Sequence, residues 1–176
     1  MTNYVYIAQS LDGYIAGPNG ELDWLNEIDN PENSDLGFAD FMDQVDALVM
    51  GRNTFEKVHS FGMWPYEKPV FVVSSKLKDI PHNLSDKAFL ISGNPREIVK
   101  SLSADGFENL YVDGGLLIQG FLESELIDRL IISTIPVILG NGISLFGKLD
   151  SRINLKFESS QVLLNQMVKT EYSVIR

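Results

Sequence analysis

The sequence predicts a single α/β domain with a mostly parallel central sheet, helices on both faces, and an antiparallel hairpin at the carboxyl end. Apolar runs typical of strands alternate with helical segments through most of the chain, and two long strands around a tight turn close it. Alternating strands and helices favour parallel pairing, because a crossover between parallel strands is usually a helix. No linker or repeat divides residues 1–176, a length typical of one domain.

The amino-terminal part opens with a strand over Asn3–Ala8, where β-branched and aromatic residues dominate. Residues 10–25 then carry three glycines and a proline, which predicts a long loop. Long ordered loops in compact domains are often functional. Apolar side chains repeat on one face of Asp35–Gln44, so we expect a helix there, capped by Asn33 or Ser34.

The middle of the chain contains short apolar runs that are typical of buried strands. We expect these strands over Ala47–Met50, Pro69–Val73 and Ala88–Ile91. Between the first two, Asn53 or Thr54 can cap a short helix that ends at Val58. This strand–helix–strand order is the pattern expected of parallel neighbours.

The carboxyl-terminal part begins with Asn94-Pro95-Arg96-Glu97, a favourable helix start because proline fits the first turn, and we expect this helix to reach Ser103. A strand, a helix and a strand follow over Asn109–Val112, over Leu116–Glu123 and within Leu126–Ile138. The tail consists of two long alternating segments around a tight turn, which predicts an antiparallel hairpin. The hairpin comprises Asn154–Leu164, Asn165-Gln166 and Met167–Ile175.

Composition argues against several classes of function. The formal net charge is −10, and DNA or an anionic membrane requires a basic face, so we expect neither nucleic acid nor a membrane as a partner. The chain has no cysteine, which excludes disulfides and thiolate zinc sites and suits a cytoplasmic protein. Residues 1–14 lack the pattern of a signal peptide, and no apolar run approaches the roughly 20 residues that span a bilayer.

Two phosphate-binding motifs are approached but not met. Gly114-Gly115 follows a predicted strand, yet the G-x-G-x-x-G fingerprint fails because Asp113 and Leu116 flank the pair. The segment Gly142–Leu149 nearly matches the phosphate loop of nucleotide triphosphatases, but a leucine stands where Ser or Thr would bind magnesium. The two histidines lie far apart with no partner at ligand spacing, so we expect no metal site.

Three short stretches follow predicted strands and carry groups suited to an anion. They are Gly51-Arg52-Asn53-Thr54, Ser74-Ser75-Lys76 and Asp113-Gly114-Gly115. In open α/β sheets, ligands bind beyond the carboxyl ends of the strands, where helix N-termini present free N–H groups. Each stretch alone is also compatible with an ordinary helix cap, polar turn or tight turn. Together, in an acidic chain, they favour a phosphate-rich dinucleotide.

These stretches resemble the dihydrofolate reductase fold. "VMGRNTFE" followed by "VFVVSSK" is similar to the phosphate-gripping units of that family, and "AQSLDGYIAG" resembles its first strand and mobile loop. "VDGG" and "IPVILGNGISLF" resemble more closely the reductase domain of bacterial riboflavin biosynthesis, especially its small stand-alone members. The resemblance covers nearly the whole chain and implies a dihydrofolate reductase-like three-layer fold. Asp113 departs from the three glycines usual in true dihydrofolate reductases, and the chain has no counterpart of the riboflavin protein's zinc deaminase domain.

The resemblance implies NADPH as the cofactor, held mainly at the three strand ends. The implied contacts are Ala8 and Ile15 with the nicotinamide; Gly51, Arg52, Asn53 and Thr54 with the pyrophosphate and adenosine side; Ser74, Ser75 and Lys76 with the 2′-phosphate; and Asp113, Gly114, Gly115, Leu116 and Leu117 with the pyrophosphate through backbone N–H groups. In such enzymes the cofactor carries the hydride, and the protein positions it and supplies protons.

The implied activity is reduction of a pyrimidine-type small molecule, similar to 5-amino-6-(5-phosphoribosylamino)uracil reductase. A pterin, as in dihydrofolate reductase, is the alternative substrate, and a nucleotide-binding module without catalysis is the alternative of another class. Asp35 lies sixteen positions before Gly51, the spacing of the pterin-binding acid, and is either a buried proton partner or an ordinary acid in a helix's first turn. Asp12 is either catalytic or a turn-forming residue before glycine. Trp24 and Phe38 either wall the substrate pocket or belong to the core.

We also expect a homodimer. The two carboxyl-terminal strands are long, and an exposed edge of that kind is usually covered or paired. Members of the family that the chain resembles often dimerise, which points the same way.

Overall fold

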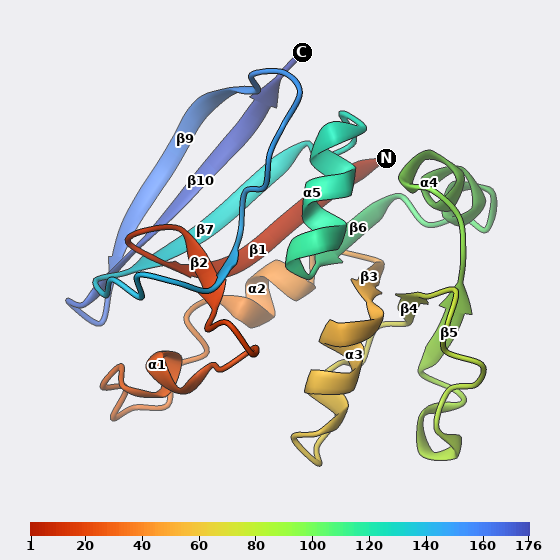
Figure 1. Ribbon diagram of the computed structural model, residues 1–176, viewed down its shortest axis with the longest axis horizontal. Coiled ribbons are helices and arrows are strands. Elements are labelled where there is room, and N and C mark those ends of the chain that lie inside the picture. Colours follow the sequence, from red (N-terminus) through yellow and green to blue (C-terminus); the bar gives the residue numbers. More distant parts are fainter.

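The computed structural model describes all residues, 1–176, and its centre is an eight-stranded mixed sheet (Figure 1). The strands of this sheet are β1 (Thr2–Ser10), β3 (Ala47–Gly51), β4 (Val70–Val73), β5 (Ala88–Ile91), β6 (Asn109–Asp113), β7 (Arg129–Ile135), β9 (Asn154–Leu163) and β10 (Met167–Ile175). Their spatial order is β5-β4-β3-β6-β1-β7-β10-β9. All neighbours from β5 to β7 are parallel, whereas β10 and β9 add antiparallel strands. The predicted parallel sheet with a terminal hairpin is confirmed.

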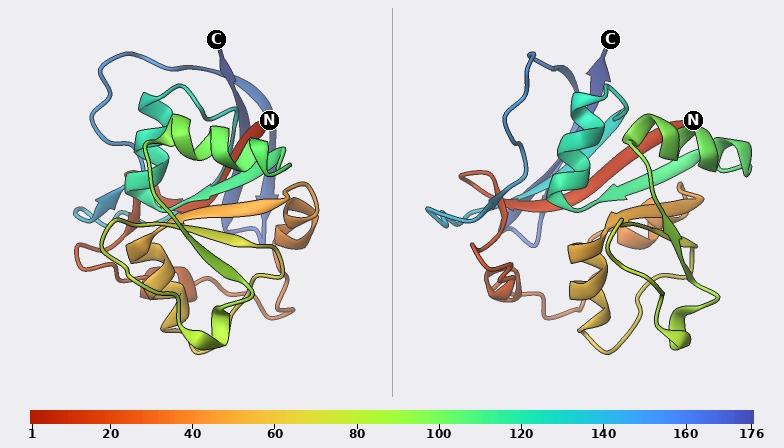
Figure 2. Two further views of the ribbon diagram at one scale, coloured as in Figure 1. Left: turned by 90° about the vertical axis from the view of Figure 1, so that its right-hand side faces the viewer. Right: turned by 45° about the vertical axis from the view of Figure 1, so that its right-hand side comes forward.

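Helices cover both faces of this sheet (Figure 2). They are α1 (Asp23–Asn26), α2 (Phe38–Met42), α3 (Arg52–His59), α4 (Pro95–Ala104) and α5 (Gly115–Glu123), with a 3₁₀ turn over His82–Leu84. In the right-hand view of Figure 2, α4 and α5 lie above the sheet, and α2 and α3 lie below it. None of the helices is long and apolar enough to cross a membrane.

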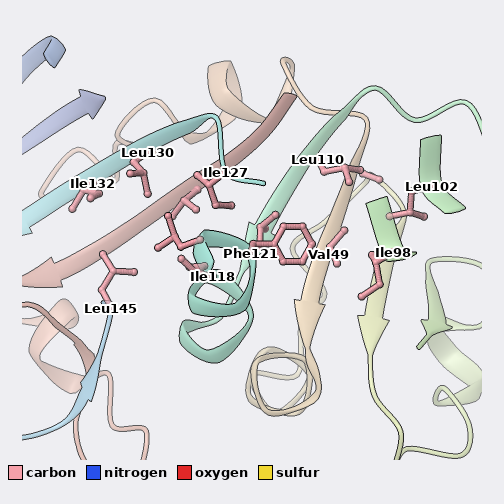
Figure 3. Close-up of a cluster of buried hydrophobic side chains, with 14 residues drawn as sticks. Val49, Ile98, Leu102, Leu110, Ile118, Phe121, Ile127, Leu130, Ile132 and Leu145 are labelled. Atoms are coloured by element: carbon pink, nitrogen blue, oxygen red, sulfur yellow. The ribbon is translucent and has the colours of Figure 1, made fainter. Parts of the chain in front are cut away.

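Each face of the sheet has its own core. On the α4–α5 side, Ile98, Leu102, Ile118 and Phe121 of the helices pack on strand residues such as Leu130 (Figure 3). On the other side, a second cluster joins α2 and α3 to the sheet through aromatic side chains. Burying one large apolar side chain contributes about 1.5–3 kcal/mol, so these two clusters hold the strand ends in fixed positions.

The helix predicted over Asp35–Gln44 is wrong at its start, because α2 begins only at Phe38. Leu36 and Gly37 have φ angles of 59° and 83°, in the left-handed region, where a right-handed helix cannot begin. The carboxylate of Asp35 accepts hydrogen bonds from the backbone N–H groups of Gly37 and Ala39, both at 2.9 Å. Asp35 therefore shapes the turn before the helix, in place of a cap from Asn33 or Ser34.

The cap predicted for α3 is also wrong, whereas the predicted start of α4 is confirmed. Extended Gly51 is the N-cap residue of α3, which has no side-chain cap from Asn53 or Thr54. In α4, Asn94 accepts a hydrogen bond from the Glu97 N–H, and the Glu97 side chain accepts one from the Asn94 N–H.

The segment expected to be a long loop, residues 10–25, contains two ordered elements. Strand β2 (Tyr14–Ala16) pairs with β8 (Ile143–Ser144) in a small second sheet, and helix α1 follows. These pairings tie the loop to the segment after β7 and place both beside the carboxyl end of β1.

Candidate functional site

The structure brings the three predicted anion-binding stretches together where the parallel strands end, at the edge of the sheet formed by the carboxyl ends of β4, β3 and β6. Strand β3 lies between β4 and β6, and its Gly51 pairs with Val73 while Met50 pairs with Asp113. The residues that follow β4, β3 and β6 therefore lie side by side. Helices α3 and α5 both begin at this edge (Figure 1).

Both helices begin without a side-chain cap. The N-cap residues are Gly51 for α3 and Gly114 for α5, and neither can supply a capping oxygen from a side chain. The first N–H groups of a helix need partners, and an anion at the helix start supplies them together with favourable charge. Two such starts at one edge suit a ligand with two phosphates.

The three glycines at this edge differ in how much room the protein leaves for a side chain. Gly114 has a φ of 99°, which favours glycine, and a Cβ added to it would collide with Thr54. A Cβ added to Gly115 would lie 2.9 Å from Ile15 Cδ1, so a side chain there would need Ile15 to shift. A Cβ on Gly51 would meet nothing within 4 Å, and its φ of −71° needs no glycine either. The space over Gly51 is therefore open to a ligand.

Polar and apolar side chains border this edge. Arg52 forms an ion pair with Glu56 of the next turn at 2.9 Å. Ser74 Oγ accepts hydrogen bonds from the backbone N–H groups of Lys76 and Leu77, while Ser75 and Lys76 are exposed. Leu116, in the first turn of α5, is 78% exposed. A large apolar side chain exposed beside uncapped helix starts suits an organic anion.

The remaining predicted cofactor contacts lie nearby. Asn53 is exposed and Thr54 half-buried on α3, and Leu117 packs on the α5-side core. Ala8 is half-buried near the end of β1, and Ile15 lies against Gly115. Their contact with a cofactor stays a prediction, and their positions around one edge are compatible with it.

Asp113, which its motif implicates only through the backbone N–H, also carries a titratable side chain at this edge. It points to the same face of β6 as Tyr111, and burial raises the pKa of its carboxyl to about 6, although the Gly114 N–H offsets part of that effect. The Asp113 charge in turn raises the pKa of Tyr66 and Tyr111, in which burial is the larger cause. Strand alternation from buried Tyr111 would have indicated this orientation.

The two acids predicted as catalytic are exposed and engaged by hydrogen bonds. Asp12 accepts from Ser10 Oγ at 2.6 Å and from the N–H groups of Leu139 and Gly140 at 3.1 and 2.7 Å. The hydrogen bond from Ser10 is the main reason why the pKa of Asp12 is lowered. Hydrogen bonds from Ala39 and Gly37 likewise lower the pKa of Asp35. Asp35 is exposed, so of its two alternatives the buried proton partner does not match the structure.

The two predicted substrate-wall aromatics differ in placement. Trp24 is only 5% exposed and packs with Ile135 and Met167, which corresponds to the core alternative. Phe38 is half-buried with its ring edge-on to Tyr6 at 5.7 Å between centroids, on the α2 side of the sheet. Its contact with a substrate stays a prediction. No group of three or more His, Asp or Glu side chains is placed to hold a metal ion.

The chain is similar in sequence and structure to known proteins. The chain is 33% identical over 172 residues to the uncharacterized protein YwjB of Bacillus subtilis, covering 96% of this chain and 95% of that one. A putative riboflavin biosynthesis protein from Shewanella sp. PV-4 has a similar structure, with a TM-score of 0.96, 47% identity and 100% of both chains covered.

More distant structures share the fold alone. The deaminase/reductase of Thermotoga maritima has a TM-score of 0.77 at 14% identity, covering 99% of this chain and 56% of that one. A dihydrofolate reductase from Enterococcus faecalis, complexed with NADP(H), has a TM-score of 0.67 at 19% identity, covering 98% and 96% of the two chains. The fold is therefore dihydrofolate reductase-like. A family model of the RibD C-terminal domain matches residues 4–169, and the chain belongs to that family of reductase domains.

Proposed function

We propose that the protein is an NADPH-dependent reductase of a pyrimidine-type substrate. The observation that carries this proposal is the pair of uncapped helix starts, at Gly51 and Gly114, on one edge of a sheet whose family consists of reductase domains. The related Thermotoga protein is named a 5-amino-6-(5-phosphoribosylamino)uracil reductase, and the related dihydrofolate reductase binds NADP(H). Both names support the same chemistry for this chain.

The residues of the edge suit the cofactor's phosphates. The N–H groups at the starts of α3 and α5 would hold the pyrophosphate, over the open space at Gly51. Arg52, Ser75 and Lys76 would hold the 2′-phosphate with charged and neutral donors. When bound, NADPH supplies the hydride.

Asp113 is the acid that we propose for proton transfer. A proton donor must still carry its proton near the working pH, and a pKa of about 6 allows this, whereas the lowered pKa values of Asp12 and Asp35 do not. Asp113 also lies at the edge itself, beside Met50 in the sheet. Asp12 and Asp35 would then act as structural residues that hold their loops.

The proposal is tested by mixing the protein with NADPH and either the ribosylamino-pyrimidine, with and without its 5-phosphate, or dihydrofolate, and following the loss of NADPH absorbance. Oxidation that depends on the pyrimidine supports the proposal, and oxidation that depends only on dihydrofolate supports pterin reduction instead. Tight NADPH binding with no turnover of either compound would support the nucleotide-binding module and contradict the proposed reaction.

We further propose that the protein forms a homodimer through the β9–β10 hairpin. Strand β9 is the edge of the sheet and is exposed along nearly its whole length. Apolar side chains on it are exposed as well, with Phe157 at 59% and Val162 at 64%. A free strand edge beside exposed apolar groups favours pairing with a second copy.

A further inference from the structure

A groove of about 180 Å³ opens on the α2 side of the sheet, between α2 and the strands β7, β10 and β9. Tyr6 and Ile131 form part of its floor, and Lys169 of β10 lines it. In the sheet, Lys169 pairs with Ser133, which pairs with Ala8. Lys169 therefore lies in the same cross-strand row as Ala8, the proposed nicotinamide contact. A substrate bound beside Ala8 would extend into the groove.

The one cation that lines the groove is already engaged. Lys169 Nζ donates a hydrogen bond to the backbone carbonyl of Leu36 at 2.8 Å and lies 5.9 Å from the centre of the Tyr6 ring. The ammonium reaches that carbonyl because Gly37 has no side chain, since a Cβ there would lie 2.8 Å from Nζ. Lys169 thus uses one of its N–H donors to anchor the turn before α2.

Carboxylates dominate the rest of the charged lining. Asp40 of α2 and Glu171 of β10 both border the groove. Glu171 also accepts a hydrogen bond from Arg129 at 2.7 Å, so these two charges are paired. Asp35 adds a further negative charge close to Tyr6 at the groove floor. Burial is the larger cause that raises the pKa of Tyr6, and the charge of Asp35 is the second. The three carboxylates Asp35, Asp40 and Glu171 outnumber the two cations Lys169 and Arg129, so a dianion in this groove would meet net repulsion.

Neutral polar groups complete the lining. Gln44, Ser159 and Gln161 offer amide and hydroxyl groups, and the side chains of Ser159 and Gln161 make no hydrogen bond within the chain. Such groups donate to and accept from hydroxyls, so they match an uncharged, hydroxylated substituent. We propose that the substrate carries such a substituent in place of a phosphate ester, and that this groove binds it. The inference rests on the proposed reductase function and narrows its substrate class.

The test compares one ribosylamino-pyrimidine with its 5-phosphate ester as substrates for NADPH oxidation by the full chain. The expected kcat/KM for the unphosphorylated compound is higher by roughly tenfold or more, since a dianion would face Asp40 and Glu171. Equal turnover or preference for the ester would overturn this inference and leave the proposed function intact. Turnover of neither compound would overturn the proposed function and the inference with it.

A matched pair of variants locates the effect in the groove. Asp40→Lys reverses a charge that lines the groove, and Asp43→Lys makes the same change on an exposed residue at the end of α2 that does not line it. We expect Asp40→Lys to lower KM for the ester by roughly three- to tenfold and Asp43→Lys to change it less than about twofold. Equal effects of the two variants, or no effect of Asp40→Lys, would overturn the role of the groove.

Discussion

Asp113 is the residue whose placement decides the proposed chemistry. Asp113→Asn should lower kcat by about 10²- to 10⁴-fold, the usual contribution of a positioned general acid. The dissociation constant for NADPH should stay within about threefold, because this position would contact the pyrophosphate only through its backbone N–H, which the substitution keeps. Steady-state kinetics and a cofactor titration on the same variant measure both values.

The pH dependence of the unaltered protein checks the same role. Below a pKa of about 6 the Asp113 carboxyl is protonated and can donate, and as the pH rises through that value the donor is lost. The rate of the chemical step should therefore fall above about pH 6, and Asp113→Glu should retain part of the activity with the same direction of pH dependence. A pH profile that Asp113→Asn leaves unchanged would contradict proton donation by this group.

Substitution of Arg52, which forms an ion pair with Glu56, tests the proposed 2′-phosphate site. Arg52→Ala should weaken NADPH binding by about ten- to hundredfold, since a charge-assisted hydrogen bond contributes about 1.5–3 kcal/mol, and it should leave NADH binding nearly unchanged. Lys76→Ala should do less, because an exposed ammonium is well solvated.

Glu56→Gln is the matched control, because it removes the ion pair while keeping the arginine. It should keep or tighten NADPH binding. If Glu56→Gln weakens NADPH binding as much as Arg52→Ala does, the ion pair stabilises α3 and the assignment of Arg52 to the 2′-phosphate is wrong.

At the scale of elements, Asp12 joins two loops beside the candidate site. Asp12→Ala should speed hydrogen exchange at the N–H groups of Leu139 and Gly140, which would lose their acceptor. Asp35→Ala is the control, because its carboxylate accepts from Gly37 and Ala39 instead and should affect only that turn. Loss of turnover in Asp12→Ala with unchanged exchange at both loops would restore Asp12 as a catalytic acid.

The elements differ in how well the sequence predicts them. Strands such as Ala47–Gly51 follow from short apolar runs bounded by turn residues, and α4 follows from its Asn94–Glu97 capping box. Helix α2 is shorter than its apolar periodicity suggests, because Leu36 adopts a left-handed conformation that its residue type does not reveal. That conformation accompanies the hydrogen bond from Lys169, 133 residues away, which local patterns cannot indicate.

The same distinction applies to the site. The three strand-end stretches are recognisable as motifs, and parallel pairing alone brings them to one edge. The raised pKa of Asp113 depends on burial beside Tyr66 and Tyr111, which come from other parts of the chain. The hydrogen bonds that Asp12 and Asp35 accept from backbone N–H groups likewise depend on backbone conformation. Local sequence therefore could not distinguish these two structural acids from catalytic acids.

At the scale of the whole molecule, the β9 edge tests the proposed homodimer. Light scattering at micromolar concentration should give twice the chain mass of 19.7 kDa. Phe157→Lys should shift the protein toward monomer, because it places a charge in the proposed interface, whereas Met63→Lys, on a side chain that is 77% exposed elsewhere, should not. A monomeric mass for the unaltered protein would rule out the homodimer.

The central claim is that the edge formed by Gly51, Ser74 and Gly114 binds NADPH, and a direct titration tests it. NADPH and NADH are titrated into the unaltered protein at low ionic strength, where the attraction between the 2′-phosphate and the cations Arg52 and Lys76 is least screened, and cofactor fluorescence reports binding. The account predicts that NADPH binds more tightly by about tenfold or more, because only NADPH carries the 2′-phosphate that Arg52 and Lys76 would contact. Equal dissociation constants for the two cofactors, or no binding of either, would contradict it.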